Sequence, residues 1–109
     1  MAMAPMTGPT NMTSDAATAL ELGLPQAMAL AIRLHRAGNL GDACTLYERI
    51  LSMAPSHADA LHFSGVLAHQ QGRADAAALI RQSIALRPDV PDWHNNLGNV
   101  LLSSGQVGA

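Results

Sequence analysis

The chain has 109 residues, enough for one domain. Apolar residues make up 49% of it and aromatic residues only 3%, with alanine, leucine and methionine prominent, so helices are favoured over a β-sandwich. The formal net charge is −2, and six arginines are scattered without any lysine. This argues against nucleic acid as a partner, because phosphate binding needs clustered cations.

The sequence carries no signal for export or membrane insertion. The only cysteine, Cys44, cannot form an internal disulfide. The N-terminal segment lacks the charged start and the continuous apolar stretch of a secretory signal, and no stretch approaches the ~18 apolar residues that span a bilayer. We therefore expect a cytoplasmic protein without a membrane partner. The all-arginine basic usage with abundant alanine and glycine is typical of a GC-rich bacterial genome.

Residues 1–24 are predicted to form a disordered arm. The first thirteen positions carry Pro, Gly, Thr, Asn and Met without periodicity. A short helix over residues 15–22 could follow, with Ser14 as its N-cap and Gly23 as its stop.

From Pro25 onward, apolar residues recur at helical spacing in five segments. Each is expected to form a helix of about 12–14 residues that ends at glycine or proline. The first runs from Pro25 to Gly38, the second to Pro55, the third from Ser56 to Gly72, the fourth to Pro88, and the fifth from Pro91 to Gly105. Such short connections favour antiparallel packing of neighbouring helices.

The landmarks repeat with a period of 33 or 34 residues. Gly38 to Gly72 is 34 residues, and Pro55 to Pro88 is 33. Periods in this range are typical of stacked helix-turn-helix units. The sequence therefore predicts an all-α fold, an α-solenoid of antiparallel helix pairs over residues 25–106. Its units would be 25–55, 56–88 and, as the first helix of a third pair, 89–106.

Two strings carry a family resemblance, LHRAGNLGDACTLYERILSMAP and GVLAHQQGRADAAALIRQSIALRPD. They resemble tetratricopeptide repeats, which implies about two and a half repeats here. Small residues would let paired helices approach, and a bulky residue would fill the gap between them. The small positions are Gly65, Gly98, Ala43 and Ala76, the bulky ones Tyr47 and Ile80, and Pro55 and Pro88 close the units. The second unit departs in Ser64, which replaces the usual leucine, and in one residue missing near 73–75.

A narrower resemblance rests on ALHFSGVLAHQQGR, LIRQSIALRPD and PDWHNNLGNVLLSSGQ. These strings are similar to the repeats before the catalytic region of bacterial O-linked N-acetylglucosamine transferase-like proteins. This implies an alternative function, that of a substrate-recognition fragment of a protein O-glycosyltransferase, inactive alone.

The family resemblance implies that the first helix of each pair lines a concave groove that binds a partner protein or peptide. The candidate partner-binding residues are Arg36, His62, Phe63, His69, Gln70, Asn95, Asn96 and Asn99, with Met28, Ile32, His35, Asp59 and Val66 on the same faces. Asparagine offers a donor and an acceptor to any peptide backbone. In the glycosyltransferase family an asparagine before Leu-Gly forms a ladder along the groove, and Asn96 occupies that place. The alternative is that Asn95 and Asn96 are ordinary solvated residues.

No pattern for catalysis, a metal or a cofactor is present in the sequence. His62 and His69 are two helical turns apart, about 10 Å along the axis, which is too far for both to ligate one ion. The sequence has no phosphate-binding glycine loop, nucleophile elbow or paired carboxylates, so we expect no enzyme activity. Cys44 is expected to be a small buried thiol, and Trp93 to pack between the second and third units.

The fifth helix leaves three alternatives open. Leu97, Val100 and Leu101 would be only partly covered by the fourth helix, which makes self-association through this C-terminal helix a candidate. The chain could then be a free-standing adaptor, a self-associating one, or the N-terminal part of a longer protein.

Overall fold

The computed structural model describes residues 23–103, and the predicted arm and short helix before them lie outside this range. The described part forms five α-helices and no strand. They are α2 (Leu24–Arg36), α3 (Leu40–Met53), α4 (Ala58–Gln70), α5 (Ala76–Leu86) and α6 (Pro91–Ser103). The prediction of an all-α repeat fold is confirmed.

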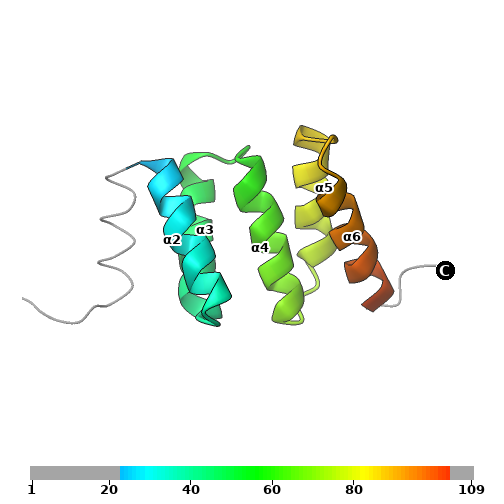
Figure 1. Ribbon diagram of the computed structural model, residues 1–109, viewed down its shortest axis with the longest axis horizontal. Helices are drawn as coiled ribbons and strands as arrows, with labels where there is room; N and C mark the ends of the chain where they lie inside the picture. Colours follow the sequence, from blue (N-terminus) through cyan, green and yellow to red (C-terminus); the bar gives the residue numbers. More distant parts are fainter. Residues whose placement is uncertain (1–22, 104–109) are drawn as a thin grey trace, which may run out of the picture.

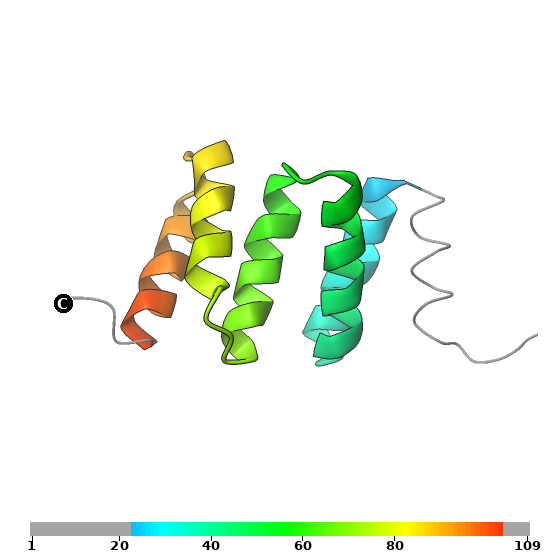
Figure 2. The same ribbon diagram turned by 180° about the vertical axis from the view of Figure 1, so that it is seen from behind.

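The helices form two layers. Helices α2, α4 and α6 lie in one layer, nearer the viewer in Figure 1, and α3 and α5 lie in the other, nearer the viewer in Figure 2. Each helix packs on the next along the chain, and α4 also contacts both α2 and α6. We call the surface of the first layer the α2/α4/α6 face.

Glycine ends the first helix of each complete pair. Gly38 and Gly72 have φ values of +86° and +73°, a left-handed conformation that glycine adopts without strain. The following backbone amides then turn back, with the N–H of Asn39 donating to the carbonyl of Leu34 at 2.9 Å. The N–H of Arg73 does the same to the carbonyl of Ala68 at 2.8 Å. These turns reverse the chain and make the paired helices antiparallel.

Most of the buried apolar residues form two clusters, one toward each end of the stack. The first joins α2, α3 and α4 through Ala27, Met28, Ala31, Ala43, Leu46, Tyr47, Ile50, Ala60 and Leu67. The second joins α4, α5 and α6 through Ala68, Ala76, Ala77, Ile80 and Val100. Helix α4 contributes to both clusters, so each pair covers the apolar side of the next, as expected for a solenoid.

Gly65 and Gly98, which occupy equivalent places, have different surroundings. A Cβ at Gly65 would lie 2.6 Å from Cγ1 of Ile80 and 3.1 Å from the carbonyl oxygen of Ala76, so α4 and α5 approach too closely for any side chain. A Cβ at Gly98 would meet nothing within 4 Å among the described residues. The predicted role of a small residue in helix approach is therefore met at Gly65 but not at Gly98.

Three further expectations about burial were wrong. Met28, expected to face the groove, is only 7% exposed and belongs to the first cluster. Val100, expected to be partly uncovered, is buried, whereas Leu102 beside it is 66% exposed. Cys44 is half-buried rather than buried. Self-association through α6 stays a prediction, and Leu102 is the large apolar residue that α6 exposes.

None of the helices in the described range is long and apolar enough to cross a bilayer.

Candidate functional site

A hollow lies on the α2/α4/α6 face between α2 and α4. Its volume is about 260 Å³. It is lined by Ile32, His35, Arg36, Phe63, Val66 and Gln70. All six were expected on the groove side, and three of them, Arg36, Phe63 and Gln70, were named as binding residues. The aliphatic and aromatic side chains make an apolar lining, and the arginine adds a cation at its edge.

A hydrogen-bonded chain of three side chains lies at the lower end of the first junction in Figure 1, where α2 and α4 end, and two of them, His35 and Gln70, line the hollow. The Nδ1 atom of His35 lies 3.0 Å from the hydroxyl of Tyr47, and Nε2 of His35 bonds Oε1 of Gln70. Because the amide oxygen can only accept, Nε2 of His35 donates to it, and Nδ1 then accepts from the hydroxyl of Tyr47. The two rings meet edge to face with centroids 5.9 Å apart. One histidine thus joins α2 to α3 and to α4. Burial raises the pKa of the Tyr47 hydroxyl, so it remains a donor.

His62 does not line the groove as expected, because the next unit covers it. Its side chain is 3% exposed and stacks on Trp93 with ring centroids 4.7 Å apart and planes 12° apart. Phe63 meets the same imidazole edge-on. The prediction that Trp93 packs between the second and third units is confirmed, and the prediction that His62 is available to a partner is wrong.

Hydrogen bonding and burial keep His62 neutral. The side-chain amide of Asn96 donates from Nδ2 to Nε2 of His62 at 3.2 Å, while Nδ1 is buried without a partner among the described residues. Desolvation lowers the pKa of His62 to about 4, outweighing the opposite effect of Asp59 and Asp92. Asn96, the expected ladder residue, therefore uses its amide nitrogen for a hydrogen bond within the protein.

Arg87 extends this cluster to the surface. Its guanidinium lies 5.3 Å from the centroid of the Trp93 ring, and Nη1 is 3.3 Å from Oδ1 of Asp59. The ion pair is about half exposed, so its contribution to stability is small, at most ~1 kcal/mol. It nevertheless links α4 to the residue that follows α5.

Two asparagines of α6 remain available. Asn95 and Asn99 lie one helical turn apart, and both are exposed. Neither side chain makes a hydrogen bond within residues 23–103, whereas Asn96 between them is half-buried. The exposed pair can therefore offer donors and acceptors to a peptide backbone.

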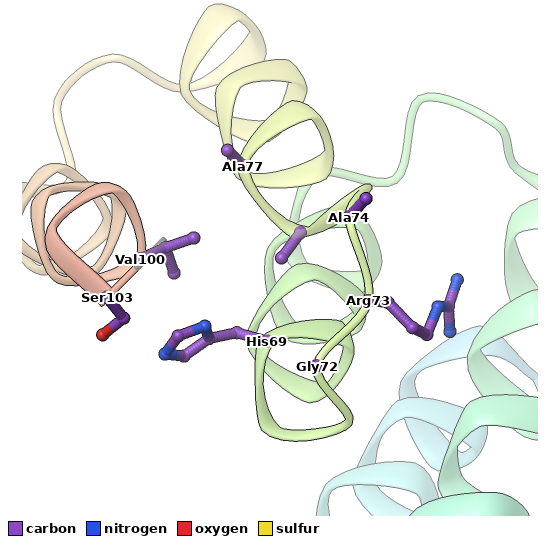
Figure 3. A pocket seen from close by; sticks show the side chains of 8 residues that line it. His69, Gly72, Arg73, Ala74, Ala77, Val100 and Ser103 are labelled. Carbon is purple, nitrogen blue, oxygen red and sulfur yellow. The ribbon is translucent and has the colours of Figure 1, made fainter. Parts of the chain in front are cut away.

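A second hollow, of about 330 Å³, lies between α4, α5 and α6. Its lining is His69, Gly72, Arg73, Ala74, Ala76, Ala77, Val100 and Ser103. Figure 3 shows the His69 ring pointing toward α6, with Val100 and Ser103 opposite, while the Arg73 side chain points the other way. Arg73 pairs with Asp75 at 2.7 Å and lies 3.4 Å from the sulfur of Cys44. The sequence did not indicate this hollow.

Between residues 23 and 103, no three histidine, cysteine or acidic side chains come together as they would around a metal ion. Burial, followed by the charge of Glu48, raises the pKa of the Cys44 thiol. Because the thiolate is the reactive form, this thiol is a poor nucleophile at neutral pH.

Comparison with known proteins identifies the repeat. A model of the tetratricopeptide repeat family matches residues 28–80 and again 74–109. The chain belongs to the tetratricopeptide repeat family. This confirms the resemblance drawn from the sequence. Tetratricopeptide repeats form protein-interaction modules, and the repeat fold itself is not catalytic.

The tetratricopeptide stack is also similar to part of a solved enzyme structure. A mutant of the O-GlcNAc transferase of Thermobaculum terrenum superposes with a TM-score of 0.72 and is 32% identical in sequence. The match covers 92% of this chain but only 18% of that enzyme. No curated protein sequence matches this chain.

Proposed function

We propose that the α2/α4/α6 face binds an extended segment of a partner protein. The observation that carries this proposal is the hollow of about 260 Å³ between α2 and α4. Ligand-binding hollows are mostly apolar with a few polar groups that fix orientation. Ile32, Phe63 and Val66 supply the apolar lining here, and Arg36 and Gln70 the polar edge.

The two ends of the face suit different parts of a peptide. At the α2 end, exposed Arg36 makes no ion pair with any residue in the described range, so it favours a carboxylate next to an apolar side chain. At the α6 end, Asn95 and Asn99 suit the peptide backbone. The scattered arginines and the absence of lysine support a protein rather than a nucleic acid as partner, and the unpaired Cys44 supports a cytoplasmic location.

Selection from a random peptide library, followed by calorimetry, tests this proposal. Arg36→Glu should weaken the selected peptides about tenfold or more, because it reverses a charge at the edge of the hollow. Arg81→Glu is the matched control, since Arg81 is also exposed but lies on α5 in the other layer. Failure to select any peptide, or an equal effect of the two variants, would contradict the proposal.

A second candidate is the substrate-recognition part of a protein O-glycosyltransferase. The observation that supports it is the 32% identity over 92% of this chain to the Thermobaculum terrenum enzyme. This chain would then recognise acceptor proteins without acting on them. A genomic reading frame that continues into a sugar-nucleotide-binding region would support this candidate, and a frame without one would count against it.

A further inference from the structure

The hollow between α4, α5 and α6 has a different lining from the hollow between α2 and α4. We propose that it receives a tyrosine side chain of the partner, with the phenolic hydroxyl bonded to His69. This inference rests on the proposed function, since it names an anchor residue in the bound segment.

The argument begins with the equivalent place one unit earlier. The repeat relates His69 to His35, Ile80 to Tyr47, and Ser103 to Gln70. At the earlier place the imidazole meets a phenolic hydroxyl on one side and an amide oxygen on the other. Around His69, Ile80 has no hydroxyl to replace that of Tyr47. Ser103 has a much shorter side chain than Gln70. The ring of His69 consequently has no hydrogen-bond partner within residues 23–103.

Two more replacements enlarge the space beside His69. Val100 stands where the earlier junction has Leu67, and Ala77 where it has Cys44. Ser103 in place of Gln70 is a third replacement, and in all three the later side chain is the smaller one. Protein interiors are normally close-packed, so several such replacements around one point leave a void. The hollow of about 330 Å³ lies where these smaller side chains replace Cys44, Leu67 and Gln70 of the first junction.

The side chains that line the hollow favour a phenol as the group that it binds. Ala76, Ala77 and Val100 make the walls apolar, which favours a ring or an aliphatic side chain. No carboxylate lines the hollow, so a cationic ligand has no counter-charge there, and Arg73 points away from it toward Asp75 and Cys44. A phenol combines an apolar ring with one hydroxyl, and it is the group that His35 already binds in this chain.

The test is an NMR titration of the whole chain, observing the imidazole signals of His69. The probes are N-acetyl-tyrosine amide and N-acetyl-phenylalanine amide. We expect the tyrosine compound to give a saturable shift and to bind about 3- to 10-fold more tightly, the value of one hydrogen bond. The inference is overturned if His69 does not respond, or if both compounds bind equally.

A variant that copies the first junction provides the matched control. Val100→Leu with Ser103→Gln introduces the residues found at Leu67 and Gln70, so the hollow should fill and the tyrosine shift at His69 should disappear. Leu102→Gln changes an exposed neighbour on α6 that does not line the hollow and should leave the shift unchanged. If the double variant does not fold, His69→Phe retains a ring without nitrogens and should remove the preference for tyrosine over phenylalanine. Persistence of that preference overturns the inference.

The outcome can be separated from that of the proposed function. Peptides that depend on Arg36 but show no gain from a tyrosine would overturn this inference alone. Binding of the tyrosine compound at His69 with no library peptide selected would overturn the peptide-binding function, and with it the partner tyrosine, leaving a phenol site.

Discussion

The stack has two junctions, one where the α2/α3 pair meets α4 and one where the α4/α5 pair meets α6. The helices follow the same order at both, but the polar contacts lie at opposite ends. Between the first pair and α4, the lower end holds the hydrogen-bonded chain from Tyr47 through His35 to Gln70. At the upper end of the same junction, Met28 and Ala60 belong to the apolar cluster. At this junction the polar contacts therefore lie at the lower end and the apolar contacts at the upper end.

Between the second pair and α6, the arrangement is reversed. The upper end holds the polar stack of His62 on Trp93, where the repeat equivalents one unit earlier are Met28 and Ala60. The lower end holds the hollow beside His69. The repeat preserves the order of the helices, while a few side chains decide where a junction is filled and where it holds a hollow. Four substitutions can test this contrast.

The largest effect is expected for Gly65→Ala. Its Cβ would lie 3.1 Å from both the carbonyl oxygen of Ala76 and the backbone nitrogen of Ile80, and neither can move without shifting α5. Overpacking of this kind should lower the free energy of unfolding by about 3 kcal/mol. Urea denaturation followed by circular dichroism measures it, and a loss below about 1 kcal/mol would mean that α4 and α5 are less tightly joined in solution.

The next effect is a pH dependence from His62. Its pKa is about 4 in the folded chain, below the value of 6.5 in the unfolded chain, so the unfolded state binds more protons between these values. The stabilisation is therefore complete above pH 6.5 and is lost as the pH falls toward 4. We expect this group alone to cost about 2 kcal/mol between pH 7 and pH 5.

Denaturation of the wild type and of His62→Phe at both pH values isolates that contribution. The variant keeps a ring on Trp93 but has no titrating group, so its stability should fall by about 2 kcal/mol less than that of the wild type. Equal losses for the two proteins would mean that His62 is not neutral and buried in solution.

A smaller effect is expected for Tyr47→Phe at the first junction. The substitution removes the hydroxyl that donates to Nδ1 of His35 while keeping the buried ring. One lost hydrogen bond in a partly buried place should cost about 1 kcal/mol. The same variant should shift the His35 imidazole signals in NMR spectra. Unchanged stability and unchanged spectra would show that the polar chain does not form.

The smallest effect is expected for Gly98→Ala, and it has the opposite sign. No described atom lies within 4 Å of the added Cβ, and alanine favours the helix over glycine. The free energy of unfolding should therefore rise by about 0.5–1 kcal/mol. A loss like that of Gly65→Ala would reveal that something covers this side of α6 in solution, and light scattering would then show whether it is a second copy.

Much of the fold was predictable because its signals are local. Glycine after each first helix and proline after each second helix marked the ends, and the 33- to 34-residue period indicated the stack. Trp93, the third residue of α6, was correctly expected to pack between units. For the candidate site, the repeat register predicted which residues of α2 and α4 gather around the first hollow, including Arg36 and Phe63.

The rest of the site was missed because it depends on the neighbouring unit. The register placed His62 on the groove side of α4, but it could not show that Trp93 lies over the imidazole and that Asn96 bonds it. The large ring at Trp93, where the equivalent residue one unit earlier is Ala60, was the signal that could have indicated this cover. The hollow beside His69 arises from small side chains at Ala77, Val100 and Ser103, on α5 and α6, none of which is unusual alone.

The sequence by itself determined the helices, their ends and the repeat, because hydrophobic periodicity and the backbone preferences of glycine and proline act within a few residues. Only the tertiary structure decided which polar side chains are buried and hydrogen-bonded within the protein and which stay exposed to a partner. Burial and hydrogen bonding depend on atoms brought together from residues about 33 apart in sequence, and small differences in side-chain size there either fill a junction or leave it open.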